Sequence, residues 1–150
     1  MSDSDEPSLI LFRRAPARLP RPWLKEFARS LRSDVAGGRA FLCLITDDRE
    51  LRRLNRQFFG INHPTDVLSF PSANDTGFLG EMAVSAQRGV AQAREFGHSA
   101  LQEMQILMLH GLLHLLGMDH ESDGGRMARA EARWRKKLGL PAGLIERGRQ

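Results

Sequence analysis

The chain has 150 residues, of which 41% are hydrophobic and 27% charged, and its formal net charge is +4. This length fits one domain with a sizeable core, and a single cysteine excludes a disulfide framework. The longest apolar stretch, Ile106 to Leu116, is much shorter than the ~20 residues of a membrane-spanning helix. Met1 to Pro7 is acidic and polar, unlike a signal peptide. We therefore expect a cytoplasmic protein with no membrane segment.

Positive charge gathers in two segments. From Leu9 to Ser33 there are seven basic residues and one acidic residue, and from Arg126 to Gln150 there are eight and two, so each segment carries a net +6. Such runs are often only solvated helix faces, but they also suit a polyanionic partner such as nucleic acid. We expect a disordered acidic tail at residues 1–8, a single domain at 9–140 and a basic C-terminal tail at 141–150.

Hydrophobic periodicity and turn residues predict strands and helices that follow one another along the chain. Asp47 with Glu50, and Ser99 with Gln102, have the spacing of helix-capping boxes. Two neighbouring strands separated by a short turn-rich loop predict one antiparallel pairing. The predicted strands are residues 9–12, 40–46, 67–70 and 78–85, and the predicted helices are 23–31, 47–58, 86–96, 99–116 and 125–138.

These elements predict an α+β fold with a small mixed sheet of about four strands and about five helices. The helix that ends near Leu116 is apolar on nearly all sides, which predicts that it is central and buried. Cys43 lies within the apolar run from Phe41 to Ile45, so we expect an inert, buried thiol.

The most informative motif is His110-Gly-Leu-Leu-His114-Leu-Leu-Gly117-Met-Asp-His120. His110 and His114 are four residues apart on a predicted helix, so both imidazoles leave the same face. Gly117 favours a positive φ that ends the helix, and the chain can then bring His120 back to the same point. A histidine pair alone is more often a pair of hydrogen-bonded core residues, but the third histidine favours a metal site. Asp119 is a candidate acceptor for one of the imidazole N–H groups.

Three neutral imidazoles with an open fourth position are typical of catalytic rather than structural zinc. Nickel, copper and iron also suit such ligands. Zinc lowers the pKa of its bound water to roughly 7, which makes a hydrolase the expected class. Zinc peptidases have a glutamate directly after the first histidine, and here that residue is Gly111. The missing general base and the basic segments favour a phosphodiester substrate.

The motifs resemble those of the YbeY family of zinc-dependent endoribonucleases, over residues from about Phe41 to Leu138. The resemblance implies a zincin-like fold, one Zn²⁺ on His110, His114 and His120, and RNA and the small ribosomal subunit as partners. It also implies a role in ribosomal RNA processing at the 3′ end of the small-subunit RNA and in ribosome quality control. The motifs that carry it are the histidine motif above, Leu54-Asn55, Pro64-Thr-Asp-Val-Leu-Ser-Phe-Pro71 and Leu79-Gly-Glu-Met-Ala-Val-Ser85.

One position departs from that pattern. Where members of the family usually have an arginine, this chain has Phe59, directly before Gly60. Either a neighbour such as Arg56 or Arg53 replaces the missing cation, or nuclease activity is weakened. The candidate substrate-binding residues are Arg56, Thr65, Asp66 and Ser69, although a turn-forming aspartate and an ordinary strand serine are equally good interpretations of the last two.

Other histidines and acids near the motif have simpler interpretations. Glu103 falls on the stripe of His110 and His114, and we interpret it as a surface or capping acid rather than a brace for the site. His63 and His98 are interpreted as surface residues.

Three hypotheses follow. The leading one is a single zinc-hydrolase domain that acts as an endoribonuclease, with the metal-bound water as attacking group and no catalytic side chain assigned. The second is a zinc metallopeptidase. The third is a ribosome-associated RNA-binding module with catalysis weakened by Phe59.

Overall fold

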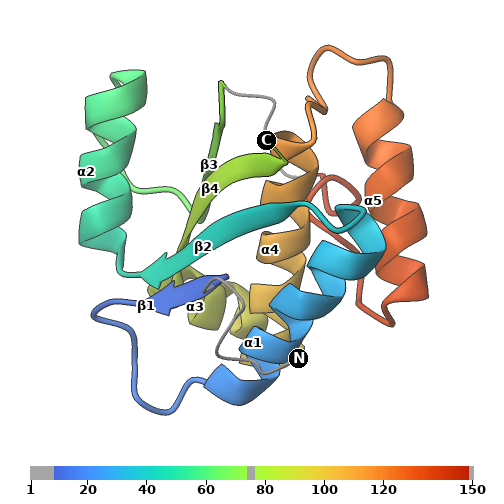
Figure 1. The fold of residues 1–150 in the computed structure, drawn as a ribbon. Helices are drawn as coiled ribbons and strands as arrows, with labels where there is room; N and C mark the ends of the chain where they lie inside the picture. Colours follow the sequence, from blue (N-terminus) through green and yellow to red (C-terminus); the bar gives the residue numbers. More distant parts are fainter. Residues whose placement is uncertain (1–8, 74–76, 149–150) are drawn as a thin grey trace.

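The computed structural model describes residues 9–73 and 77–148, so the tail predicted at residues 1–8 lies outside the described residues. Within the described part, the chain forms four strands, five α-helices and one π-helical turn, which is the α+β class that we predicted (Figure 1). The strands are β1 (Ile10–Phe12), β2 (Ala40–Thr46), β3 (Val67–Pro71) and β4 (Phe78–Ser85); the helices are α1 (Arg21–Ser30), α2 (Asp48–Phe59), α3 (Ala86–Phe96), α4 (Ala100–Leu115) and α5 (Arg126–Lys137), and the π-helical turn is Leu31–Val35.

The strands form one mixed sheet in the order β1-β2-β4-β3. β1 pairs with β2, and β2 with β4, in parallel, whereas β3 pairs with β4 antiparallel as predicted. In the register of β3 and β4, Ser69 lies opposite Met82 and Phe70 opposite Glu81. β3 is therefore an edge strand whose successive side chains point to opposite faces of the sheet.

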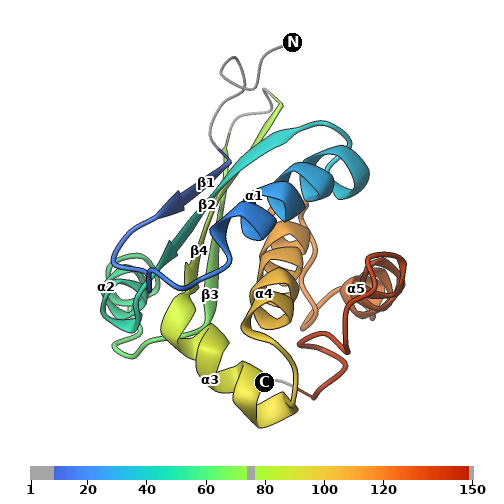
Figure 2. The same cartoon turned by 90° about the horizontal axis from the view of Figure 1, so that it is seen from below.

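The two faces of the sheet are covered unequally. Figure 2 shows α1, α3, α4 and α5 on one face and α2 on the other. The predicted central helix is confirmed, because most side chains of α4 are buried against the sheet and the neighbouring helices. No described helix has both the length and the apolar character that crossing a membrane requires.

Residues close to the helix ends determine where most of the helices begin and end. The Asp47 side chain accepts the backbone N–H of Glu50 at 3.0 Å, and α2 ends at Gly60 with a φ of +70°. Only this half of the predicted capping box is found, because the Glu50 carboxylate turns to arginines instead. α1 starts at Arg21, before the predicted start, because Pro22 is tolerated in the first turn of a helix.

Residues 141–148, where the sequence indicates a basic tail, pack back onto the domain. Leu144 is buried, and the Arg147 guanidinium donates to both carboxylate oxygens of Glu103, at 2.9 and 3.0 Å. The segment is held because it covers apolar core and neutralises a buried acid.

Candidate metal centre

α4 places two histidines one helical turn apart. Its N-terminus is a complete capping box, in which the Ser99 hydroxyl accepts the backbone N–H of Gln102 and the Gln102 side chain accepts that of Ser99, both at 3.0 Å. The helix continues to Leu115, so His110 and His114 share a face. Their ring centroids lie 4.9 Å apart, and His110 is buried.

His120 reaches the same point from the loop after α4. Gly117 takes a φ of +92°, as expected for the residue that turns the chain out of the helix. Within the loop, the Asp119 carboxylate accepts hydrogen bonds from the Glu121 backbone N–H at 3.2 Å and from the Ser122 hydroxyl at 2.9 Å. The ring centroid of His120 then lies 5.8 and 5.9 Å from those of the other two histidines.

The structure thus brings together the three histidines selected from the sequence. Each ring offers one ligand nitrogen, and these nitrogens all lie within 4.8 Å of one another. That spacing is close enough for the three rings to converge on one metal ion. The cluster is therefore a candidate metal site.

Hydrogen bonds to the other ring nitrogens set the orientation of two of these ligands. The Nδ1 atom of His110 lies 2.8 Å from a carboxylate oxygen of Glu131, and that of His114 lies 2.9 Å from the backbone carbonyl of Met118. Both partners are acceptors, so each Nδ1 carries the proton and each Nε2 keeps its lone pair. The prediction that Asp119 accepts from an imidazole was wrong, because its carboxylate is used to shape the loop.

The electrostatics of His114 also suit a metal ligand. Burial lowers the pKa of its imidazole, and the neighbouring His110 lowers it further, against an opposing effect of the hydrogen bond to Met118. The neutral form is therefore favoured. A neutral imidazole is the form that binds a metal ion.

Glu131 is the residue that the sequence analysis missed. It comes from α5, on the same buried stripe as Met127, and it is itself buried. Its second carboxylate oxygen accepts the backbone N–H of Ile145 at 2.9 Å, and a Cβ at Gly143 would collide with its side chain. An acidic residue on the apolar stripe of a helix is unusual, so Glu131 could have been singled out from the sequence for that reason.

Glu103 and His98 were also misinterpreted. Glu103 is fully buried, away from the metal cluster, and the Nε2 atom of His98 lies 2.6 Å from its carboxylate. Burial raises the pKa of Glu103, but hydrogen bonds from Arg147, His98 and Gln92 outweigh it, so the pKa is lower than usual. His63, in contrast, is exposed as expected.

Comparison with known proteins identifies the family of this chain. The model of the family described as endoribonuclease YbeY matches residues 17–139. The chain belongs to the endoribonuclease YbeY family.

Individual proteins similar to this chain match most of its length. The endoribonuclease YbeY of Solibacter usitatus is 61% identical over 144 residues, which is 96% of this chain and 97% of that protein. The endoribonuclease YbeY of Roseiflexus castenholzii is 45% identical over 132 residues, 81% of this chain and 82% of its own. The solution structure of TM1509 from Thermotoga maritima superposes with a TM-score of 0.58 at 27% identity, covering 85% of this chain and 89% of that one.

The four candidate substrate-binding residues occupy different environments in this YbeY-family fold. Arg56 is exposed on α2, and Ser69 donates a hydrogen bond of 2.8 Å to the backbone carbonyl of Gly111, next to His110. Thr65 is half-buried and donates to the carboxylate of Asp66, which is itself buried. Ser69 is thus the candidate that contacts the histidine-bearing helix.

Phe59, the residue at which we expected a family arginine, lies at the C-terminal end of α2. Phe59 is 50% exposed, and its ring stacks on that of Phe70 with a centroid separation of 5.8 Å. Arg53 and Arg56 are both exposed; Arg53 is paired with Glu50, and Arg56 lies one turn before Phe59. An exposed cation is therefore present one helical turn from Phe59.

Proposed function

We propose that this protein is a zinc-dependent endoribonuclease that cleaves single-stranded RNA, with His110, His114 and His120 as metal ligands. The observation that supports this most directly is the convergence of three imidazole nitrogens, two of which have their Nδ1 protons bound by Glu131 and Met118. Among the residues that the structure describes, the cluster offers three histidine ligands, and three protein ligands with an open fourth position are typical of a catalytic zinc site.

The residues around the site have defined tasks in this proposal. Glu131 and the Met118 carbonyl hold protons on Nδ1 so that Nε2 stays available. Zinc, when bound, supplies an acidified water and a Lewis acid for attack on a phosphodiester. Ser69 anchors β3 to the backbone beside His110 and thereby fixes one wall near the site.

The geometry at Gly111 argues against a peptidase. In zinc peptidases a glutamate occupies this position and acts as general base. Here a Cβ at Gly111 would lie 2.9 Å from the Sδ atom of Met82, 3.1 Å from Val67 and 3.3 Å from Ser69. A side chain at this position would therefore have to displace Met82 and press on Val67 and Ser69, so the close packing of α4 on β3 and β4 disfavours such a base.

The substrate and setting follow from family membership and charge. We assign Arg56, Thr65, Asp66 and Ser69 to RNA binding, within a single zinc-hydrolase domain that spans residues 9–140. We place the protein in the cytoplasm, in ribosomal RNA processing at the 3′ end of the small-subunit RNA and in ribosome quality control, with the small ribosomal subunit as partner.

Metal analysis and RNA cleavage test the proposal together. Purified protein should contain about one zinc per chain and cut single-stranded RNA, and a His114→Ala variant should lose both properties. His63→Ala is the matched control, because His63 is an exposed histidine outside the cluster. Cleavage that continues at full rate without the three imidazoles would contradict the mechanism.

The substitution at Phe59 supports a second candidate, an RNA-binding module with weak turnover. If the missing cation limits catalysis, Phe59→Arg should raise the cleavage rate without changing zinc content. If Arg56 replaces it, Arg56→Gln should lower the rate and Phe59→Arg should have little effect. Rates measured for both variants distinguish the two cases.

A further inference from the structure

The face of the sheet opposite α4 is only partly covered. Along β2, Cys43 and Ile45 are buried toward α4, whereas Leu42 and Leu44 alternate with them and remain partly exposed. The helix on this side is α2 (Figure 2). Because one helix does not cover the whole of this face, some of its apolar surface remains exposed and is available to a ligand.

A groove of about 370 Å³ lies between α2 and this face. That volume falls at the lower end of the range for small-molecule sites and suits one nucleotide rather than a large ligand. The side chains that matter for its chemistry are Leu44, Phe58, Phe70, Arg13, Arg53 and Glu81.

Aromatic rings form one wall of the groove. The rings of Phe58 and Phe70 meet edge to face at a centroid distance of 5.2 Å, and Phe59 extends the cluster by stacking on Phe70. Phe58 is 56% exposed and Phe59 50% exposed. Exposed aromatic faces beside a cavity are suited to stacking of a nucleobase.

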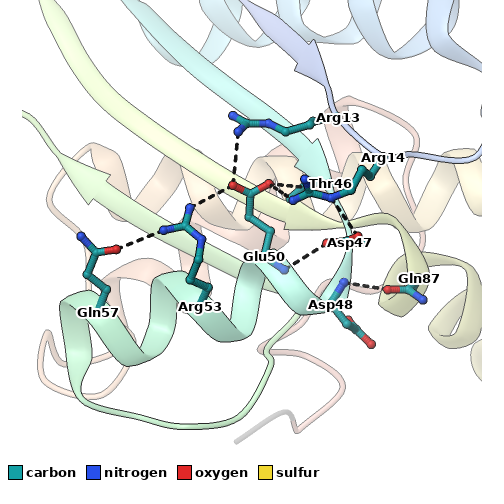
Figure 3. Close-up of polar contacts among 9 residues, drawn as sticks. All are labelled: Arg13, Arg14, Thr46, Asp47, Asp48, Glu50, Arg53, Gln57 and Gln87. Carbon is teal, nitrogen blue, oxygen red and sulfur yellow. Dashed lines mark hydrogen bonds and ion pairs between the residues drawn. The ribbon is translucent and has the colours of Figure 1, made fainter.

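A buried carboxylate, Glu50, holds two of the arginines that line the groove. Figure 3 shows the guanidinium groups of Arg13, Arg14 and Arg53 converging on Glu50. Their nearest nitrogens lie 3.5, 2.8 and 3.1 Å from its carboxylate oxygens. The Glu50 side chain is only 3% exposed and also accepts the hydroxyl of Thr46, whereas Arg13 and Arg53 are about half exposed. Each guanidinium has five N–H donors, so these contacts leave donors directed toward solvent.

We propose that this groove is a nucleotide-binding subsite for the single-stranded RNA substrate. A base stacks against Phe58 and Phe70, and a neighbouring phosphate contacts Arg13 and Arg53, which Glu50 has already oriented. Glu81 is an exposed carboxylate on the floor, and it can accept a hydrogen bond from an exocyclic amino group of the base. The inference rests on the proposed nuclease function, because it names where that substrate binds.

The groove is connected to the metal centre through β3. Ser69 and Phe70 are successive residues of this edge strand and point to opposite faces. Ser69 contacts the backbone beside His110, and Phe70 lines the groove. An RNA strand that passes around the β3 edge can therefore occupy the groove and reach the histidine cluster at once.

Binding of a fluorescein-labelled eight-nucleotide single-stranded RNA tests the proposal. We would measure it by anisotropy in a His114→Ala background, in which cleavage does not interfere. Phe58→Ala should weaken affinity about 5- to 150-fold, the equivalent of the ~1–3 kcal/mol per stacked base. Arg53→Gln should lower the slope of log affinity against log salt by about 0.7, as expected for one lost phosphate contact. Trp23→Ala and Arg94→Gln are matched controls, since both residues are exposed and lie outside the groove.

A second measurement needs no substitution in the groove. RNA that carries 4-thiouridine should crosslink on irradiation to the peptide that contains Phe58 or to the one that contains Phe70. If the protein cuts RNA but both groove variants bind like the controls and the crosslink falls elsewhere, the groove proposal is wrong and the nuclease function stands. If the protein neither binds nor cuts RNA, the proposed function fails and this inference with it.

Discussion

Glu131→Gln isolates the contribution of the carboxylate that orients His110. In the parent, the two oxygens of Glu131 accept from the His110 Nδ1 and from the Ile145 N–H, at 2.8 and 2.9 Å. Glutamine has nearly the same shape but offers one acceptor and one donor. Either its NH₂ group faces the Ile145 N–H and leaves two donors opposed, or it faces Nδ1 and moves the imidazole proton to Nε2, where it blocks metal binding.

We expect zinc affinity to fall about 10- to 100-fold, the usual effect of removing such a partner. The unfolding free energy of the metal-free protein should fall by about 1–3 kcal/mol, because a buried group loses its hydrogen bond. Competition with a chelating dye measures the first quantity and urea unfolding the second. Glu26→Gln is the control, since that carboxylate is exposed on α1 and pairs with Arg29 instead. Zinc affinity of Glu131→Gln within twofold of the parent would refute the orienting role.

Three further predictions concern the buried charges and the thiol. Arg147→Met should destabilise the protein by about 3–5 kcal/mol in urea unfolding, because Glu103 remains buried without its cation. Since hydrogen bonding lowers the Glu103 pKa below its ordinary 4.5, its stabilisation should be complete above pH 4.5 and lost as the pH falls through the lower folded value. Urea midpoints between pH 7 and 3 should therefore decline less steeply in Glu103→Gln. Burial raises the pKa of Cys43 to about 12, so a thiol reagent should label it only after unfolding.

Local patterns were sufficient for the helices and for the convergence of the three histidines. The capping box at Ser99, the spacing of His110 and His114 and the glycine that ends α4 all act within a few residues. These interactions join residues that are close in the sequence, so they form wherever the helix forms, whatever the rest of the fold. The antiparallel pairing of β3 and β4 was predictable for the same reason, since a short loop joins them.

Contacts between distant segments could not be read from the sequence. Glu131 is 21 residues from His110, and Arg147 is 44 residues from Glu103. Periodicity shows which face of a helix is buried but not which polar group it meets there, so Glu103 was taken for a surface or capping acid. The groove beside α2 was missed because it depends on how far one helix extends over the sheet.

The hydrogen bond from Ile145 to Glu131 makes the final described segment a part of the metal centre's support. Segments near a chain end open locally at a lower free-energy cost than the whole domain. If residues 143–147 detached, the Glu131 oxygen that accepts from Ile145 would lose its partner, while α4 and the sheet stayed folded. Zinc release and global unfolding are thus separable events, and amide exchange at Ile145 should slow when the ion binds.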